Sequence, residues 1–185
     1  SFLLYAAYCV ALCLVLPIRP SPASTPPILK PLHLDVGART SWSVLLLTAF
    51  LFAFIDMVID PLALRGDRWF LGKIYYYLDP GLHFGVPFAN YVGWMVVGLI
   101  SLAIYFPLER RLSALELPPS VTPQLLLGVG LYHGVLAFNL SVTFWIGELL
   151  VGMTGLLMHL PIIALLMLRL VGPRDKREER ELRDV

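Results

Sequence analysis

Two aspartates four residues apart stand at the end of a long apolar run. The run WSVLLLTAFLFAF (42–54) carries no charge, and IDMVIDP follows it, so Asp56 and Asp60 have i, i+4 spacing. On a helix this spacing places both side chains on one face, with Cβ atoms about 6 Å apart. Two carboxyl groups in such a poorly solvated place cannot easily both ionise, so we expect one to hold a proton at neutral pH. The pair then offers a stored acid beside a base.

The stretch after the acid pair is rich in aromatic and polar side chains. Residues 66–94 read GDRWFLGKIYYYLDPGLHFGVPFANYVGW. Aromatic rings stabilise positive charge in a site that excludes bulk water, so an acid beside aromatic walls suits the protonation of an isolated alkene to a carbocation. Asn90, His83 or a tyrosine hydroxyl would hold the water that quenches the cation. The Gly-Val-Pro turn at 85–87 precedes re-entry into the bilayer, which favours a re-entrant lid.

These residues also have ordinary structural explanations. Asp60, taken by itself, could cap the helix end or pair with Arg65 or Arg68. Asp56 lies one turn deeper, and this position favours a functional role. A belt of Trp and Tyr at a membrane interface accounts for about half of the aromatic residues without any ligand. Acidic residues inside a membrane nevertheless usually face the interior of a helix bundle or a water-filled cavity, and their presence there usually indicates a functional site.

The composition identifies a membrane protein. The 185 residues are 58% hydrophobic and 15% charged, with a mean hydropathy of +0.76, which is far more apolar than an ordinary soluble domain. The net charge of +1 argues against a nucleic-acid partner. Cys9 and Cys13 lie one helical turn apart in an apolar run, where we expect them to pack as small hydrophobes. The sequence has no CxxC, Cys/His cluster, HExxH, phosphate loop or nucleophile elbow, so we expect neither a metal nor another cofactor.

Five apolar runs predict an all-α, polytopic bundle of transmembrane helices. A hydrocarbon core about 30 Å thick needs roughly 20 mostly apolar residues per helix. We expect spans at about 1–18, 42–62, 88–107, 124–144 and 147–171, in a single domain (1–171) followed by a charged tail (172–185). Pro17 and Pro20, Pro61 and Pro107 are expected to close the first three spans, and Pro161 to bend the fifth. The segment TFWIGE (143–148) predicts a tight hairpin.

The connections carry the charge that orients the chain. The tail GPRDKREERELRDV is rich in Arg and Lys, so the positive-inside rule predicts an integral protein of the cell (plasma) membrane with a cytoplasmic C-terminus. The same orientation puts 19–41 and 108–123 inside and 65–87 outside. The chain opens at Ser1 within an apolar run that lacks signal-peptide features, so we expect it to be N-terminally incomplete.

Other intramembrane polar and small residues are expected to serve helix packing. Hydrogen bonds between helices are predicted for His133, Asn139, Glu148 and His159. Glu148 opens the fifth span, where a carboxylate also favours the helix dipole. Gly130 and Gly134 form a GxxxG pattern, which predicts a close contact between helices.

Three motifs in the middle of the chain together resemble a known family. FIDMVIDP (54–61), GDRWF (66–70) and GVPFANYVGW (85–94) resemble the integral-membrane carotenoid biosynthesis family, which includes the carotenoid 1′,2′-hydratases and bisanhydrobacterioruberin hydratase. The similarity covers about residues 42–107 at motif level. Members of that family look longer, with further spans before the position of Ser1.

The resemblance implies a cofactor-free addition of water across the terminal 1,2 double bond of an acyclic, lycopene-like carotenoid. On this hypothesis Asp56 protonates C2, Trp69 and Trp94 stabilise the tertiary cation at C1, and water held near Asn90 or Asp60 adds to it. The catalytic set is then Asp56, Asp60 and Asn90, and the substrate-binding set is Trp69, Tyr76, His83, Pro87 and Trp94. The lipid bilayer and other enzymes of the carotenoid pathway are the expected surroundings.

Two other functions stay open at this point. A lycopene-cyclase-like isomerase would use the same acid and aromatic residues, but an internal double bond would attack the cation instead of water. A non-catalytic membrane protein would bind carotenoid or lipid, or would relay protons through the aspartates as a small transporter subunit. Transport predicts internal repeats, and the five runs show none.

Overall fold

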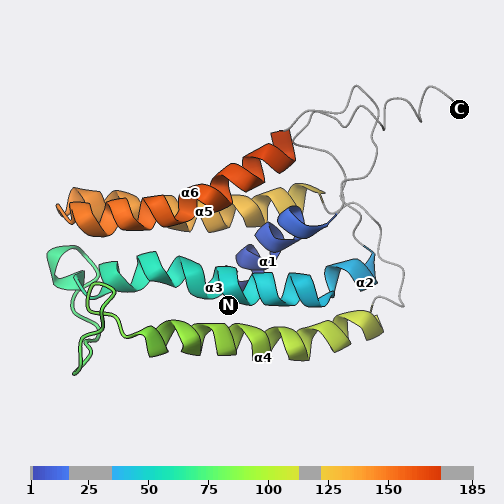
Figure 1. Cartoon of the computed structure of the whole chain (residues 1–185), viewed down its shortest axis with the longest axis horizontal. Coiled ribbons are helices and arrows are strands. Elements are labelled where there is room, and N and C mark those ends of the chain that lie inside the picture. Colours follow the sequence, from blue (N-terminus) through green and yellow to red (C-terminus); the bar gives the residue numbers. More distant parts are fainter. Residues whose placement is uncertain (1, 17–34, 113–121, 172–185) are drawn as a thin grey trace, which may run out of the picture.

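The protein is an all-α bundle of apolar helices (Figure 1). The computed structural model describes residues 2–16, 35–112 and 122–171. In chain order the helices are α1 (Phe2–Val15), α2 (Val36–Arg39), α3 (Trp42–Ala63), α4 (Phe88–Leu112), α5 (Thr122–Trp145) and α6 (Leu149–Val171), with a 3-10 turn at Gly66–Arg68. The predicted fold class, a bundle of transmembrane helices, is confirmed. The closing prolines Pro17 and Pro20, most of the connections 19–41 and 108–123, and the tail 172–185 lie outside the described residues.

Four helical stretches are long and apolar enough to cross a membrane. They comprise residues 36–63, 88–112, 125–145 and 149–169. The described part of the first predicted span is shorter, because α1 has 14 residues. At 1.5 Å per residue such a helix is about 21 Å long, which is less than the hydrocarbon core of about 30 Å.

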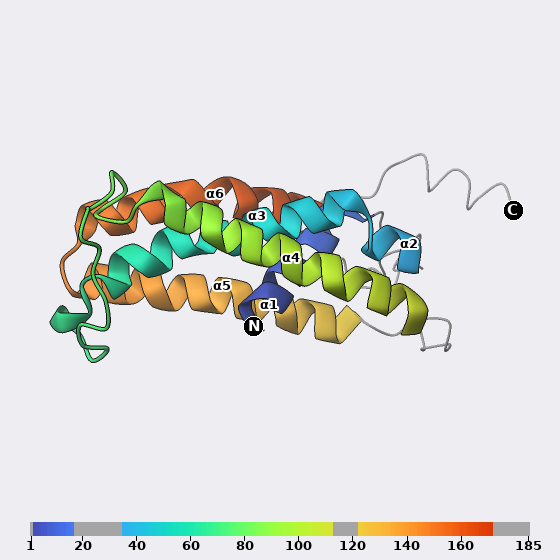
Figure 2. The same cartoon turned by 90° about the horizontal axis from the view of Figure 1, so that it is seen from below.

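Helix α1 lies in the centre of the bundle, between the α3–α4 and α5–α6 pairs (Figures 1 and 2). Every residue from Ala6 to Cys13 is buried. Both cysteines are free thiols in this core, as predicted. Gly128 of α5 lies so close to Cys9 that a Cβ on this glycine would come within 2.3 Å of the cysteine Sγ. A small residue is therefore required where α5 crosses α1.

Close helix contacts occur at other glycines than the predicted GxxxG pair. A Cβ at Gly130 or Gly134 would meet nothing within 4 Å, so the prediction for these two residues is wrong. The face of α5 that carries them does not meet another described helix at close range. By contrast, a Cβ at Gly98 of α4 would lie 3.2 Å from the Cα of Ala49 on α3. This contact brings α3 and α4 together along the side of the bundle that carries the acid pair.

Prolines and a glycine turn shape the helix ends. Pro61 lies in the last turn of α3, but α4 continues through Pro107 to Leu112, five residues beyond the predicted end. Pro161 lies inside α6, which changes direction in its second half (Figure 1). Gly147 has a φ of +82°, a left-handed conformation that favours glycine, in the short turn between α5 and α6. The predicted tight hairpin therefore joins two antiparallel helices.

Candidate active site

The two aspartates lie on the face of α3 that meets α4. Ser41 caps the start of α3, because its side chain accepts from the backbone N–H of Val44, and the helix continues from Trp42 to Ala63. Asp56 and Asp60 are one turn apart on this helix and are only 6% and 7% exposed. The i, i+4 spacing has therefore placed both carboxyl groups on one buried face, where unsatisfied polar groups are costly.

Asn90 of α4 joins the two carboxyl groups. Its side-chain nitrogen Nδ2 donates to Oδ2 of Asp56 at 3.0 Å and also to Oδ2 of Asp60. Pro87 immediately precedes α4, and its carbonyl oxygen accepts from the backbone N–H of Asn90 at 3.0 Å. The start of α4 thus fixes the amide over the acid pair, and one nitrogen holds both carboxyl oxygens close together.

Two tyrosines of the connecting loop donate to Asp60. The hydroxyl of Tyr75 donates to Oδ1 at 2.6 Å, and that of Tyr77 donates to Oδ2 at 3.2 Å. Partial burial and the hydrogen-bonded Asp60 raise the pKa of Tyr75, and the same causes raise the pKa of Tyr77 to about 12. Both hydroxyls therefore keep their protons at neutral pH and serve as donors. Among the described residues, three side chains donate to Asp60, whereas only Asn90 donates to Asp56.

The Gly-Val-Pro turn packs against the end of α3. His83 Nε2 donates to the backbone carbonyl of Met57 at 3.0 Å, and Val86 is fully buried. The turn closes through backbone pairing of Gly81 with Gly85, and a Cβ on Gly81 would lie 2.1 Å from the carbonyl oxygen of Val86. This close approach requires glycine. The loop therefore folds back over the helix end that carries the acid pair.

An aromatic wall lies one helical turn deeper than the acid pair. Phe52 precedes Asp56 by four residues on α3, and Trp94 follows Asn90 by four residues on α4. The two rings meet edge to face, with centroids 5.4 Å apart. Because both spacings equal one turn, the rings lie on the same seam as the carboxyl groups. Trp94 keeps 38% of its surface exposed.

Tyr91 adds a free hydroxyl near this seam. Its ring lies edge to face with that of His83, with centroids 5.7 Å apart. The side chain is 5% exposed, and its hydroxyl has no hydrogen-bond partner among the described residues. The hydroxyl is also close enough to Asp56 and Asp60 to interact with them electrostatically. It is therefore available to a bound water or substrate.

Two predicted substrate-binding residues do not join the acid pair. Trp69 packs against Phe70 and against Phe138 of α5, with ring centroids 4.8 and 6.4 Å away. Tyr76 is 67% exposed, and the ammonium of Lys73 lies 5.5 Å from its ring centroid. The neighbours Tyr75 and Tyr77 point inward instead. The sequence did not identify these two as partners of Asp60, because their orientation depends on how the irregular loop folds back.

The arginines after α3 pair with a different carboxylate. Arg65 Nε lies 2.9 Å from Oε2 of Glu148, and Arg68 also pairs with Glu148. Neither Asp56 nor Asp60 takes part in an ion pair with a described residue. The predicted alternative, in which Asp60 pairs with Arg65 or Arg68, is therefore wrong.

The other intramembrane polar residues bond within their own helices. The side chains of His133, Asn139 and His159 each contact the carbonyl four residues earlier, at 2.9, 2.8 and 3.0 Å. The prediction of bonds between helices is wrong for these three, because the helix backbone supplies a nearer acceptor. Within the described ranges no three His, Cys, Asp or Glu side chains gather as a metal site would require.

Comparison with known proteins places this site within a family. Neither a search of curated proteins nor a search of solved structures finds a match. A family model described as "Carotenoid biosynthesis protein" matches residues 26–161. The match includes the acid pair, the loop that covers it and Asn90, and it confirms the resemblance seen in the motifs. The chain is a membrane protein that belongs to the carotenoid biosynthesis protein family.

Proposed function

We propose that the protein hydrates the terminal 1,2 double bond of an acyclic carotenoid end group at the Asp56–Asp60 pair. The observation that carries this proposal is the unequal set of donors around the two carboxyl groups. Tyr75, Tyr77 and Asn90 stabilise a negative charge on Asp60, while Asn90 is the one described side chain that donates to Asp56. Hydrogen bonds to the ionised form favour ionisation. Asp56 is therefore the proton donor, and Asp60 is the base.

The reaction balances with water as the only co-reactant. The Asp56 O–H bond breaks as its proton forms a bond to C2 of the end group, which leaves a tertiary cation at C1. The oxygen of a water molecule then forms a bond to C1 and loses a proton to Asp60. Transfer of that proton from Asp60 back to Asp56 restores the site, and the product is a tertiary alcohol.

The aromatic wall supports the cationic step. The rings of Phe52 and Trp94 lie one turn deeper than the acid, on the side from which an apolar chain would approach. The negative face of an aromatic ring attracts positive charge most strongly where water is excluded. Trp94 takes the role expected of the tryptophans in the sequence, and the position of Trp69 against α5 does not support the same role for it.

The start of α4 supplies the candidates for holding the water. Asn90 and the unpartnered hydroxyl of Tyr91 are the polar groups on α4 beside the carboxyl pair. A water molecule bonded to Tyr91 and Asp60 would lie within reach of a cation formed next to Asp56. The tight packing of the turn at Gly81 and Val86 over the end of α3 limits the entry of bulk water, which would otherwise compete at both carboxyl groups.

Product analysis tests the proposal. Cells that make an acyclic carotenoid and express the protein should accumulate a more polar pigment that is heavier by one water, and the Asp56→Asn variant should not. A product of unchanged mass with a new ring would favour cyclisation. Unchanged pigment in the presence of well-expressed protein would overturn the proposal and favour a binding role.

A further inference from the structure

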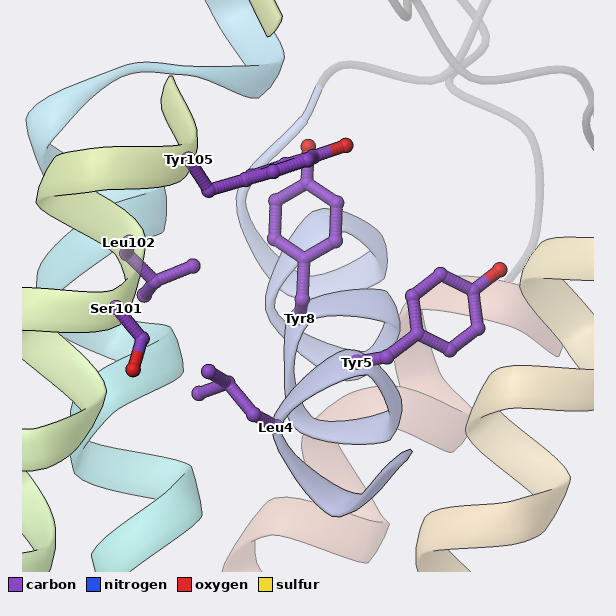
Figure 3. Close-up of a pocket in the computed structure, with 6 residues that line it drawn as sticks. All are labelled: Leu4, Tyr5, Tyr8, Ser101, Leu102 and Tyr105. Atoms are coloured by element: carbon purple, nitrogen blue, oxygen red, sulfur yellow. The ribbon is translucent and has the colours of Figure 1, made fainter. Parts of the chain in front are cut away.

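A cavity lies between α1 and α4, away from the acid pair. Its volume is about 300 Å³, and it is lined by Leu4, Tyr5, Tyr8, Ser101, Leu102 and Tyr105. Figure 3 shows the three α4 side chains reaching toward α1, with Leu4 and Tyr8 facing them. A cavity of this size, mostly apolar and with a few hydroxyls, has the character of a small-molecule site.

Two of the tyrosines that line this cavity, Tyr8 and Tyr105, have hydroxyls bonded to protein groups. The hydroxyl of Tyr105 donates to Oε2 of Glu109 at 2.6 Å, and Glu109 pairs with Arg39 at 2.7 Å. Tyr8 donates its hydroxyl to the backbone carbonyl of Arg39 at 3.1 Å. The hydroxyls of both tyrosines are thus turned to protein partners, and what the two residues offer a ligand is their ring faces. The cavity therefore suits an uncharged, apolar ligand.

The cavity and the acid pair share one face of α4. Asn90, Trp94, Gly98, Ser101 and Tyr105 follow one another at steps of four, four, three and four residues, which keeps them on a single helical face. Asn90 holds the acid pair, and Ser101 and Tyr105 line the cavity. At 1.5 Å per residue these two positions lie about 16 and 22 Å from Asn90 along the helix. Gly98, between the two sites, lies against Ala49 and Phe52 of α3.

We propose that this cavity holds the distal part of the acyclic carotenoid whose end group reacts at Asp56. The proposal rests on the proposed function, because only a ligand that is extended and apolar over this length can occupy both places. A linear polyene meets that requirement, and its conjugated chain packs well on the faces of Tyr8 and Tyr105. The cavity thereby selects long substrates over short ones that carry the same end group.

Filling the cavity tests this assignment. Ser101→Trp places a large ring in the cavity, and Ile104→Trp is the matched control, because Ile104 is 70% exposed and does not line the cavity. Ser101→Leu is a smaller filler for the case in which the tryptophan variant does not fold. For each purified protein we would measure the carotenoid retained, by visible absorption, and the hydration of a long carotenoid and of a short acyclic isoprenoid with the same end group.

Ser101→Trp should lower carotenoid retention and the rate of hydration of the long substrate about tenfold, which corresponds to about 1.4 kcal/mol. The rate of hydration of the short substrate should not change. Ile104→Trp should change neither. Equal losses on both substrates, or no loss on the long one, would overturn the proposal. Ser101→Trp could also lose bound phospholipid while its carotenoid retention stays constant. That result would overturn the proposal in favour of a lipid site. If the protein hydrates neither substrate but Ser101→Trp still lowers carotenoid retention, the proposed reaction is overturned and the assignment of the cavity to carotenoid binding is supported.

Discussion

Two groups of carboxylates at the same end of the bundle are stabilised in opposite ways. Asp56 and Asp60 accept hydrogen bonds from neutral donors, namely Asn90, Tyr75 and Tyr77. Glu148, at the start of α6, instead pairs with the two arginines that follow α3 in the sequence. Asp60 is nearer to those arginines along the chain, and yet Glu148, some 80 residues away, receives them.

This difference in partners distinguishes a carboxyl group that can transfer a proton from a carboxylate that stabilises the fold. A guanidinium beside a carboxylate favours its ionised form and so removes it as an acid. Neutral amides and hydroxyls satisfy a carboxyl group without fixing its charge. Glu109 at the other end of α4 follows the first pattern, since it pairs with Arg39. The Asp56–Asp60 pair follows the second pattern.

Removing the proposed acid should have the largest effect. Asp56→Asn keeps the shape and the bond to Asn90 but cannot donate an acidic proton, so we expect hydration to fall at least about 100-fold, the lower range for general-acid catalysis. Carotenoid retention and thermal unfolding should stay close to wild type. The matched control is Glu148→Gln, which makes the same chemical change at an arginine-paired carboxylate. Comparable losses in both variants would remove the distinction between the two groups.

Breaking the bridge between the carboxyl groups should have the next largest effect. Asn90→Leu removes the donor that both aspartates share, so the pair loses its fixed geometry while both carboxyl groups remain. We expect the rate of hydration to fall about tenfold. A hydrogen bond to a charged group contributes about 1.5–3 kcal/mol, but Asp60 keeps its other two donors, which limits the loss. Initial rates on a fixed amount of folded protein would measure it. A rate equal to that of wild type would show that the bridge is not needed for proton transfer.

The loop tyrosines allow a test within one tripeptide. Tyr75→Phe removes a 2.6 Å hydrogen bond to Asp60, Tyr77→Phe removes one at 3.2 Å, and Tyr76→Phe removes a hydroxyl at the surface. We expect a loss of about five- to tenfold for the first, a smaller loss for the second and none for the third, following bond strength. The three variants share one chemical change, so rates that fall equally would point to loop folding and not to the charge on Asp60.

The sequence predicted the helices well because each one is apolar along most of its length. The starts of α3 and α4 match the predicted spans at 42 and 88. In the hydrocarbon core, the backbone N–H and C=O groups of an apolar run of about 20 residues must bond to one another, and a helix achieves this. The central position of α1 was not predictable, because hydropathy gives no order of packing. Its long run of buried residues reflects contacts with helices that are distant in the sequence.

The candidate site was predictable only in its local part. The i, i+4 spacing of Asp56 and Asp60 follows from helix geometry, and the motif around Asn90 suggested that α4 would meet them. The roles of Tyr75 and Tyr76 could not be separated, because they depend on how an irregular loop folds back. The pairing of Arg65 with Glu148 was also hidden, since a charged side chain can reach any partner that the fold brings near.

The smallest expected effect belongs to the arginine-paired group itself. Glu148→Gln leaves Arg65 and Arg68 without their shared carboxylate, but both arginine side chains are partly exposed, at 22% and 46%. Partly exposed ion pairs contribute about 1 kcal/mol or less, which corresponds to about 2–4 °C in the unfolding midpoint of a chain of this size. We therefore expect a small decrease in the midpoint in detergent and unchanged hydration. A large loss of hydration with the midpoint unchanged would mean that the α5–α6 turn controls the position of the loop, and that Glu148 acts on the acid pair through Arg65.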